Sequence, residues 1–229
     1  MGDQTGTLHV GLIGPLPPPY GGMANQLNQL KDLLGKEAIQ ISLVQTNRPY
    51  ENKLIEKIKG LRAGYRLIPY FFNVWALAGK VDVIHMLANS GWSWQLFAAP
   101  VLWIGWLRKT PVIINYRGGE AREYLNKSIK WVRPSMNKAA AVVVPSGYLK
   151  EVFSDFEIDC QIIPNIINLD RFRTSHNKKK INQKQPNLIV TRNLEAVYGL
   201  ATALKALSLV KKEIPNFRLS IAGSRPQKE

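Results

Sequence analysis

Three short stretches of this chain combine glycines with charged or polar residues in an order that suits ligand chemistry. They are the glycine loop GPLPPPYGGMA (residues 14–24), the turn NYRGGEA (residues 115–121) and the segment TRNLEAVYGL (residues 191–200). Each follows a short apolar run and precedes a helical pattern. An α/β protein builds its ligand crevice in this way, at the carboxyl ends of parallel strands. The sequence therefore predicts a ligand site assembled from these three stretches.

In the glycine loop, Gly21 and Gly22 leave the backbone amides at the start of the next helix uncovered. Such amides, together with the positive end of the helix dipole, can bind a phosphate or a sugar hydroxyl. A tight turn without a ligand explains the two glycines equally well. The loop lacks the G-x-G-x-x-G pattern, and no acidic residue ends the apolar run at 42–46. A dinucleotide-dependent dehydrogenase is therefore not expected.

The turn after residue 116 gathers a cation, two glycines and a carboxylate at the end of an apolar run. Arg117 can bind phosphate through two parallel hydrogen bonds, and Glu120 can accept hydrogen bonds from sugar hydroxyls, beside Gly118 and Gly119. The alternative is local: Glu120 favours the start of a helix, and Arg117 pairs with it. Neither interpretation specifies a reaction.

Most of the chain alternates short apolar runs with helical stretches. The runs are almost continuously apolar, as expected of parallel strands covered on both faces, and lie at 8–14, 39–44, 81–86, 111–116, 140–145 and 160–164. Between the first two runs, one helical face carries Met23, Leu27, Leu30 and Leu34. We predict a doubly wound, parallel-sheet, Rossmann-like α/β domain over residues 1–173.

A composition change predicts a second, smaller part. Residues 174–186 are almost free of apolar residues and are expected to be a linker. Residues 187–229 then contain a strand at 187–190, a helix and a strand at 217–223, which is the first βαβ unit of a second Rossmann-like domain. A lone unit of this size buries too little surface to be stable unless it docks on the first domain.

The net charge of +15 and the sequence pI near 10 predict an anionic partner. No helix-turn-helix, zinc-binding or RNA-binding pattern is visible, so we expect no nucleic acid. One cysteine and three scattered histidines favour a reducing compartment and a protein without a disulfide or a metal ion. The first residues lack the features of a secretory signal, and the apolar stretch 92–107 is short and interrupted. A cytoplasmic protein is therefore expected.

An anionic membrane surface is another candidate partner. Leu54, Ile58, Leu61 and Tyr65 share one face of a helical pattern that is otherwise rich in lysine and arginine, which suits peripheral membrane contact. Five of the six tryptophans follow, at Trp75, Trp92, Trp94, Trp103 and Trp106. Tryptophan fills cores between helices and sheets and also favours membrane interfaces. Of the two, we expect core packing.

The order of motifs closely resembles glycosyltransferase family four. The matching stretches are PPPYGGMA, NYRGGEA, VVVPSGYLKEVF, IIPNIINLDRF and TRNLEAVYGL, and the fourth is the most specific. The resemblance implies two facing Rossmann-like domains and transfer of a sugar from a nucleoside-diphosphate sugar to a hydroxyl acceptor, with retention of configuration. It implies no obligatory metal or other cofactor. Glycans and lipid-linked molecules are the acceptors it suggests.

The resemblance also assigns roles by position. Gly21 and Gly22 would lie near the donor phosphates and the acceptor, and Arg192 would brace the leaving diphosphate. Arg117 stands where the family usually has a histidine, and Tyr198 stands where it has a lysine. The candidate catalytic residues are Arg117 and Glu120. The candidate donor- or acceptor-binding residues are Gly21, Gly22, Gly118, Gly119, Ser146, Asn165, Arg192 and Glu195.

The chain departs from the family in one large respect. Two glutamates eight residues apart, which the family uses to grip the donor, do not occur before Glu229. We therefore expect a carboxyl-terminally truncated enzyme with impaired transfer. The alternative is a non-catalytic, basic, membrane-surface module derived from the same fold. The sequence names neither the donor sugar and nucleotide nor the acceptor.

Overall fold

The computed structural model describes residues 7–48, 59–169, 172 and 185–223, and the chain divides into two compact units. Unit 1 is Met1–Ile167 and unit 2 is Asn168–Glu229. The division falls inside the motif IIPNIINLDRF, and the linker expected at 174–186 lies outside the described residues except for its last two.

Unit 1 contains a six-stranded, entirely parallel sheet with the strand order β2-β1-β3-β4-β5-β6. The predicted doubly wound α/β fold is confirmed. The last strand is shorter than expected: Ile163 still donates its amide to the carbonyl of Val144, but Pro164 has no N–H with which to continue the ladder. The strands are β1 (His9–Gly14), β2 (Gln40–Gln45), β3 (Val83–Ala88), β4 (Val112–Tyr116), β5 (Ala141–Val144) and β6 (Gln161–Ile162).

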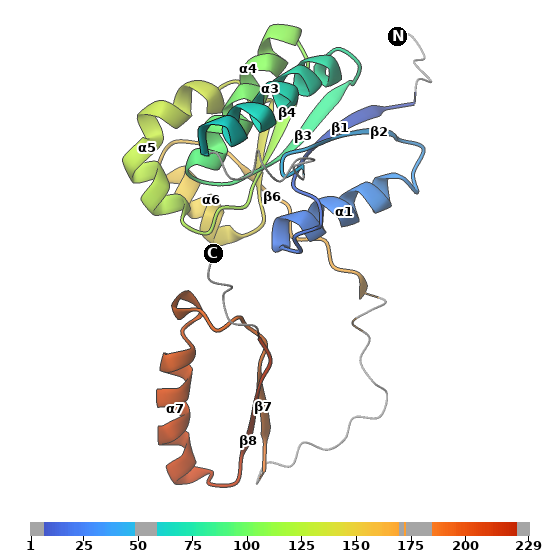
Figure 1. Ribbon diagram of the computed structural model, residues 1–229. Coiled ribbons are helices and arrows are strands. Elements are labelled where there is room, and N and C mark those ends of the chain that lie inside the picture. Colours follow the sequence, from blue (N-terminus) through green and yellow to red (C-terminus); the bar gives the residue numbers. More distant parts are fainter. Residues whose placement is uncertain (1–6, 49–58, 170–171, 173–184, 224–229) are drawn as a thin grey trace. The chain divides into compact units, whose positions relative to one another are not determined.

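The helices of unit 1 cover the two faces of this sheet unequally. The step from β1 to β2 runs in one direction along the sheet and all later steps run in the other. Right-handed crossovers therefore place α1 (Gly22–Leu34) on one face, where it is the only described helix of unit 1. The opposite face carries the remaining helices (Figure 1), which are α3 (Lys59–Ala78), η1 (Trp94–Ala98), α4 (Ala99–Arg108), α5 (Ala121–Met136) and α6 (Gly147–Ser154).

Each face of the sheet has its own core. Leu12 and Ile13 are neighbours in β1 and are both fully buried, the first against α1 and the second against the opposite layer. Phe153 of α6 is fully buried and meets the ring of Tyr116 edge-on, with ring centroids 4.9 Å apart. Continuous apolar strands therefore reflect burial on both faces, as expected.

The tryptophans differ from expectation. Trp94 is fully buried, and its indole N–H donates to the hydroxyl of Ser135 at 3.1 Å. The core-packing prediction is wrong for the other four. Trp75, Trp103 and Trp106 lie on α3 and α4, which form the outer layer and turn only one side toward the sheet, and Trp92 lies just before η1. The exposed ones are Trp75, Trp92, Trp103 and Trp106.

No helix in the described part of the chain is long and apolar enough to cross a membrane. The apolar stretch at 92–107 is shared between η1 and α4. Of the proposed amphipathic face, Tyr65 is exposed on α3, whereas Leu54 and Ile58 and the side chain of Leu61 lie outside the described residues.

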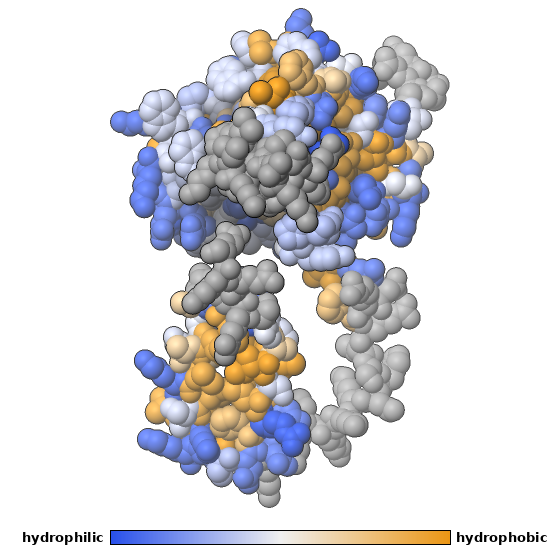
Figure 2. Space-filling model, viewed as in Figure 1, coloured by the Kyte–Doolittle hydropathy of each residue, from blue (hydrophilic) through white to orange (hydrophobic). Residues whose placement is uncertain are grey.

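Unit 2 is a single βαβ arrangement. Its two strands are parallel and pair from Asn187 with Arg218 to Val190 with Ile221. Helix α7 has no buried residue, and apolar residues lie open on the face of this unit seen in Figure 2. The elements are β7 (Asn187–Val190), η3 (Ala196–Tyr198), α7 (Leu200–Glu213) and β8 (Arg218–Ile221).

Candidate functional site

Arg117 is the centre of the candidate site in unit 1. It follows β4, is half-buried, and donates from Nε to Oδ1 of Asn115 at 3.1 Å. Its Nη1 donates to Oε1 of Gln26 at 3.5 Å and to Oδ1 of Asn165. The guanidinium is thus oriented by three side-chain amides from three separate parts of the chain. Burial lowers the pKa of Arg117.

Gln26, on α1, joins that helix to the segment that follows β6. Its Nε2 donates to the carbonyl of Ile166 at 2.9 Å, and the amide of Ile166 donates back to its Oε1 at 2.8 Å. The side chain therefore pairs with the main chain of residue 166 as a neighbouring strand would. This contact brings Asn165 and Gln26 to the same guanidinium. Gln26 could not be predicted as a site residue from the sequence, because nothing local distinguishes it from other polar residues of an amphipathic helix.

His85, in β3, is hydrogen-bonded to the Asn115 side chain that orients Arg117. Because Oδ1 of Asn115 accepts from Arg117, the Nδ2 of Asn115 faces Nε2 of His85, at 3.1 Å. Nε2 is therefore the acceptor, and the neutral ring carries its proton on Nδ1. Burial, and then the charge of Arg117, lower the pKa of His85 to about 4. A neutral histidine thus ends a chain of hydrogen bonds that orients the arginine.

Gly118 lies in a tight space that explains the choice of glycine. A Cβ atom there would lie 2.8 Å from the hydroxyl of Tyr116 and 2.9 Å from Oδ1 of Asn89. Tyr116 and Ser90 share a 2.7 Å hydrogen bond between their hydroxyls at this point. Burial raises the pKa of Tyr116 to about 12, against a smaller opposing effect of that hydrogen bond. The turn can therefore pass close to β3 only without a side chain.

The other three candidate glycines stand in open space. Gly21 is the N-cap of α1, and nothing within 4 Å would meet a Cβ at Gly21, Gly22 or Gly119. Their lack of side chains is therefore not required by packing within the described residues. The preceding loop is held by Asn47, whose side-chain amide exchanges hydrogen bonds of 2.9 and 2.8 Å with the main chain of Leu16. The sequence gives no local sign of this role of Asn47 either.

Two other predicted residues have different surroundings. Glu120 is exposed at the N-cap of α5 and makes no side-chain capping bond. Of the local alternative, the position of Glu120 at the start of a helix is confirmed, but its pair with Arg117 is not, because Arg117 bonds to amides instead. Ser146 caps α6 by accepting from the amide of Leu149 at 3.3 Å, so its hydroxyl has a structural role.

The predicted residues of unit 2 lie at the carboxyl end of β7. Arg192 is exposed and stacks on the ring of Tyr198, with 5.3 Å between the guanidinium carbon and the ring centroid. Glu195 is the N-cap of η3 and accepts from Nδ2 of Asn193 at 3.4 Å. Arg192 and Tyr198 thus form one cationic and aromatic group on this unit.

The electrostatic character of the site in unit 1 is positive. Among the described residues, no carboxylate forms an ion pair with Arg117, and the first turn of α1 contains no acidic residue. A cluster of potential metal ligands is likewise not found in the part of the chain that the structure describes. The arrangement offers an oriented cation to an anionic group.

The sequence profile of Glycosyltransferase Family 4 matches residues 20–171 of this chain. The match covers unit 1 from the glycine loop through the segment that follows β6, including Arg117, Gln26 and Asn165. The chain belongs to this family, whose members are glycosyltransferases, and its class of function is therefore sugar transfer. No curated protein matches the chain.

Solved structures show the same fold at low sequence identity. An alpha-glucosyltransferase in complex with UDP-glucose and DNA containing an abasic site has 10% identity and a TM-score of 0.50, with 96% of this chain and 68% of that one covered. A second alpha-glucosyltransferase complex, with UDP and a mismatched 13-mer DNA, has 11% identity, 81% and 48% coverage and a TM-score of 0.47. A UDP-N-acetylglucosamine 2-epimerase from Rickettsia bellii has 15% identity and a TM-score of 0.46, with 94% of this chain and 62% of that one covered. These similarities concern the fold alone.

Proposed function

We propose that this chain transfers a sugar from a nucleoside-diphosphate sugar to a hydroxyl acceptor, at the carboxyl edge of the six-stranded sheet. The proposal rests on the surroundings of Arg117. Gln26, Asn115 and Asn165 orient its guanidinium, and no described carboxylate neutralises it. An oriented, uncompensated arginine suits a diphosphate better than a neutral sugar. The glucosyltransferase of similar fold was captured with such a donor, UDP-glucose.

In the proposed reaction the bond from the anomeric carbon to the diphosphate oxygen breaks, and its electron pair leaves with the diphosphate. The acceptor oxygen bonds to the anomeric carbon from the same face, which retains the configuration, and its proton goes to the diphosphate or to water. Arg117 stabilises the charge that develops on the departing group. Because protein cations supply this stabilisation, we propose that no metal is obligatory and that a chelator leaves transfer unchanged.

Gly119 gives the acceptor or the sugar close access to the backbone beside Arg117, and Gly21 and Gly22 do the same at the start of α1. Gly118, which is packed against Tyr116 and Asn89, lets the turn adopt this position. Glu120, exposed and without a capping bond, remains available to sugar hydroxyls. We propose a glycan or lipid-linked acceptor. Ser146 is the weakest candidate, since its hydroxyl already caps α6.

Calorimetric titration with uridine and guanosine diphosphates tests the proposal. Arg117→Ala should weaken binding roughly tenfold or more, since a charge-assisted hydrogen bond contributes about 1.5 to 3 kcal/mol. Arg122→Ala is the matched control, because Arg122 lies on α5 and pairs with Asp155 at the surface. Equal effects of the two substitutions, or no binding by the wild-type chain at millimolar ligand, would contradict a donor site at Arg117.

Impaired transfer by this chain is a further part of the proposal. Unit 2 carries Arg192 and Glu195, but α7 has no buried residue, so that unit holds its residues less firmly than unit 1 holds its own. Tyr198 replaces a lysine that the family resemblance predicts, which removes one phosphate contact. A non-catalytic module remains the alternative hypothesis, and family membership favours transfer.

A further inference from the structure

We propose that the outer side of α3 and α4 is a membrane-docking surface that binds an anionic lipid bilayer. We call it the aromatic surface. It lies on the helical layer that covers one face of the sheet, and it is separate from the residues around Arg117. It consists of Tyr65, Ile68, Phe72 and Trp75 of α3 and Trp103, Trp106 and Leu107 of α4.

The α3 part is an apolar stripe that faces outward. Its four residues follow one another at spacings of three, four and three, so they share one side of the helix. They are between 43% and 71% exposed, whereas Tyr70, Val74 and Leu77 on the other side are buried in the core. The stripe runs for about 15 Å along the helix. A helix of a globular protein normally turns its apolar side inward only.

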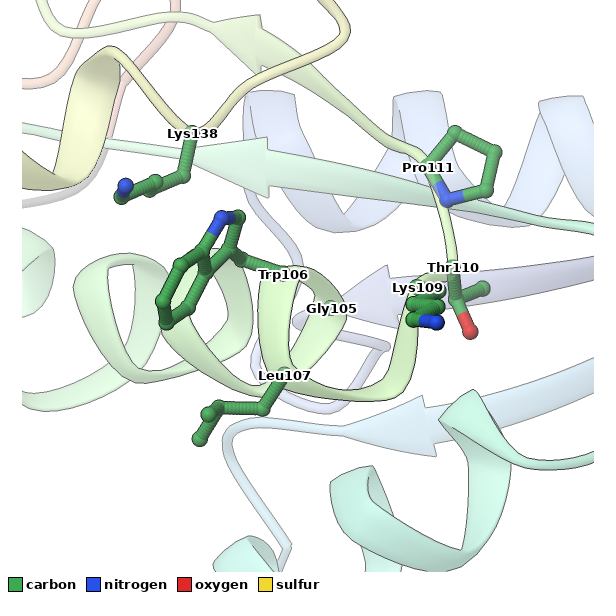
Figure 3. Close-up of a pocket in the computed structure, with 7 residues that line it drawn as sticks. All are labelled: Gly105, Trp106, Leu107, Lys109, Thr110, Pro111 and Lys138. Carbon is green, nitrogen blue, oxygen red and sulfur yellow. The ribbon is translucent and has the colours of Figure 1, made fainter.

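The α4 part extends this stripe around a shallow hollow. Trp103, Trp106 and Leu107 are between 40% and 59% exposed, and the two indole rings meet edge-on at 5.9 Å. Figure 3 shows the residues that line this hollow, which are Gly105, Trp106, Leu107, Lys109, Thr110, Pro111 and Lys138. Aromatic rings and aliphatic side chains are thus presented together to solvent.

Cations border the aromatic surface at close range. The guanidinium of Arg108 lies 5.0 Å from the ring centroid of Trp75, which joins the α3 and α4 parts. The amino group of Lys138 lies 4.2 Å from Trp106 and 5.2 Å from Trp103, and Lys109 also lines the hollow (Figure 3). Exposed indoles beside lysine and arginine are the combination found where proteins meet anionic headgroups.

The charge of this region fits a lipid surface rather than another protein. Residues 59–111, which include α3 and α4, contain six lysines and arginines but one acidic residue, Asp82, which accepts a hydrogen bond from the amide of His9. A protein partner usually meets charges of both signs at the rim of its interface. A bilayer with acidic lipids presents one sign of charge above an apolar layer, and the aromatic surface is complementary to both.

The position of the hollow leaves the candidate site accessible. Lys109 and Pro111 precede β4, and Lys138 precedes β5, so the hollow lies at the amino edge of the sheet. Arg117 follows β4 at the carboxyl edge, about 16 Å away for a five-residue strand. A chain docked by the aromatic surface would therefore keep its crevice open to substrates near the bilayer.

Co-sedimentation of the full chain with vesicles tests the proposal. We expect binding to phosphatidylcholine vesicles that contain about one third phosphatidylglycerol, and much weaker binding to phosphatidylcholine alone. The variant Trp103→Ser with Trp106→Ser should bind at least about tenfold more weakly, because it removes exposed apolar area. Trp131→Ser should leave binding unchanged, since Trp131 is 77% exposed but lies on α5.

Binding by the aromatic surface must be distinguished from non-specific electrostatic attraction, because a chain of net charge +15 attracts any anionic vesicle. Lys109→Gln with Lys138→Gln should weaken binding roughly 25-fold, at about fivefold for each basic residue in contact with the membrane. Lys127→Gln with Lys130→Gln removes the same charge from exposed positions on α5 and should cost less than about twofold. Equal losses for the two pairs would overturn the proposal.

Tryptophan fluorescence gives a second test. Tryptophans that enter the interface should be quenched by lipids brominated on their acyl chains, and the Trp103→Ser, Trp106→Ser variant should lose most of that quenching. Absence of quenching would overturn the proposal. So would a dimer that forms without vesicles and dissociates in the Trp103→Ser, Trp106→Ser variant, because the surface would then bind a second copy of the chain.

Discussion

The two units of this chain use the same local elements but differ in what they bury. In unit 1, Leu12, Ile114 and Phe153 are fully buried between a six-stranded sheet and two helical layers. In unit 2, α7 has no buried residue, and Ile189 and Leu209 are 68% and 64% exposed. Two strands and one helix do not enclose a core. An apolar strand and an amphipathic helix therefore specify local structure, and the number of layers decides how firmly a site is held.

The largest expected difference between the units concerns their cores. Phe153→Ala should lower the free energy of unfolding of unit 1 by about 3 to 5 kcal/mol, because it empties a fully buried site against Tyr116. Leu209→Ala, its counterpart in unit 2, should cost less than about 0.5 kcal/mol. Urea unfolding followed by circular dichroism measures both. Similar costs would show that unit 2 buries this leucine after all.

His85, which is hydrogen-bonded to Asn115 below Arg117 in the series of side chains described above, should make the stability of unit 1 depend on pH. The pKa of His85 is about 4 in the folded chain and near 6.5 when unfolded, so the unfolded chain binds more protons between these values. Stability should therefore fall as the pH is lowered from 6.5 to 4, by up to about 3 kcal/mol. In His85→Gln this part of the pH dependence should disappear. An unchanged slope in the variant would mean that another group titrates.

Substitution of two adjacent glycines at the candidate site, Gly118 and Gly119, should change the stability of unit 1 by different amounts. Gly118→Ala should destabilise unit 1 by about 1 to 3 kcal/mol, because the new methyl group meets the hydroxyl of Tyr116 and Oδ1 of Asn89. Gly119→Ala, one residue later, meets nothing within 4 Å and should change stability by less than about 1 kcal/mol. Thermal unfolding of the pair checks this. A neutral Gly118→Ala would show that the turn moves aside without cost.

The smallest expected effect concerns the cation of unit 2. Arg192→Ala should weaken binding of uridine or guanosine diphosphate roughly tenfold, through loss of a charge-assisted contact, and leave the melting temperature almost unchanged. Arg218→Ala in β8 is the matched control, since it removes an exposed arginine from the same unit. If both substitutions reduce binding equally, the effect of Arg192 is one of general charge.

Much of the fold could be predicted from local pattern. The strand β7 has the predicted bounds, and β4 begins one residue later than expected, because continuous apolar runs in a parallel sheet need burial on both faces. The motif order around Arg117 and the segment at 162–172 also indicated the family that the sequence profile confirms. The role of Arg117 and the other candidate residues remains a prediction.

The surface and the support of the site could not be predicted in this way. Four tryptophans proposed as core residues are exposed, because the choice of helix side depends on which layer a helix joins. Gln26, Asn47 and His85 are ordinary polar residues in their local sequences. They became site residues only through partners that are distant in the chain, as with Gln26 and Ile166.

The sequence by itself determined the strands, the helices and the residues that end each strand, because these depend on spacings of a few positions. The tertiary structure alone decided which of those residues meet. Arg117 contacts Gln26 and Asn165, which are 91 and 48 positions away, because the strand order sets β1, β3 and β4 side by side and places α1 over them. Sheet order is a property of the whole core, which no short stretch of sequence encodes.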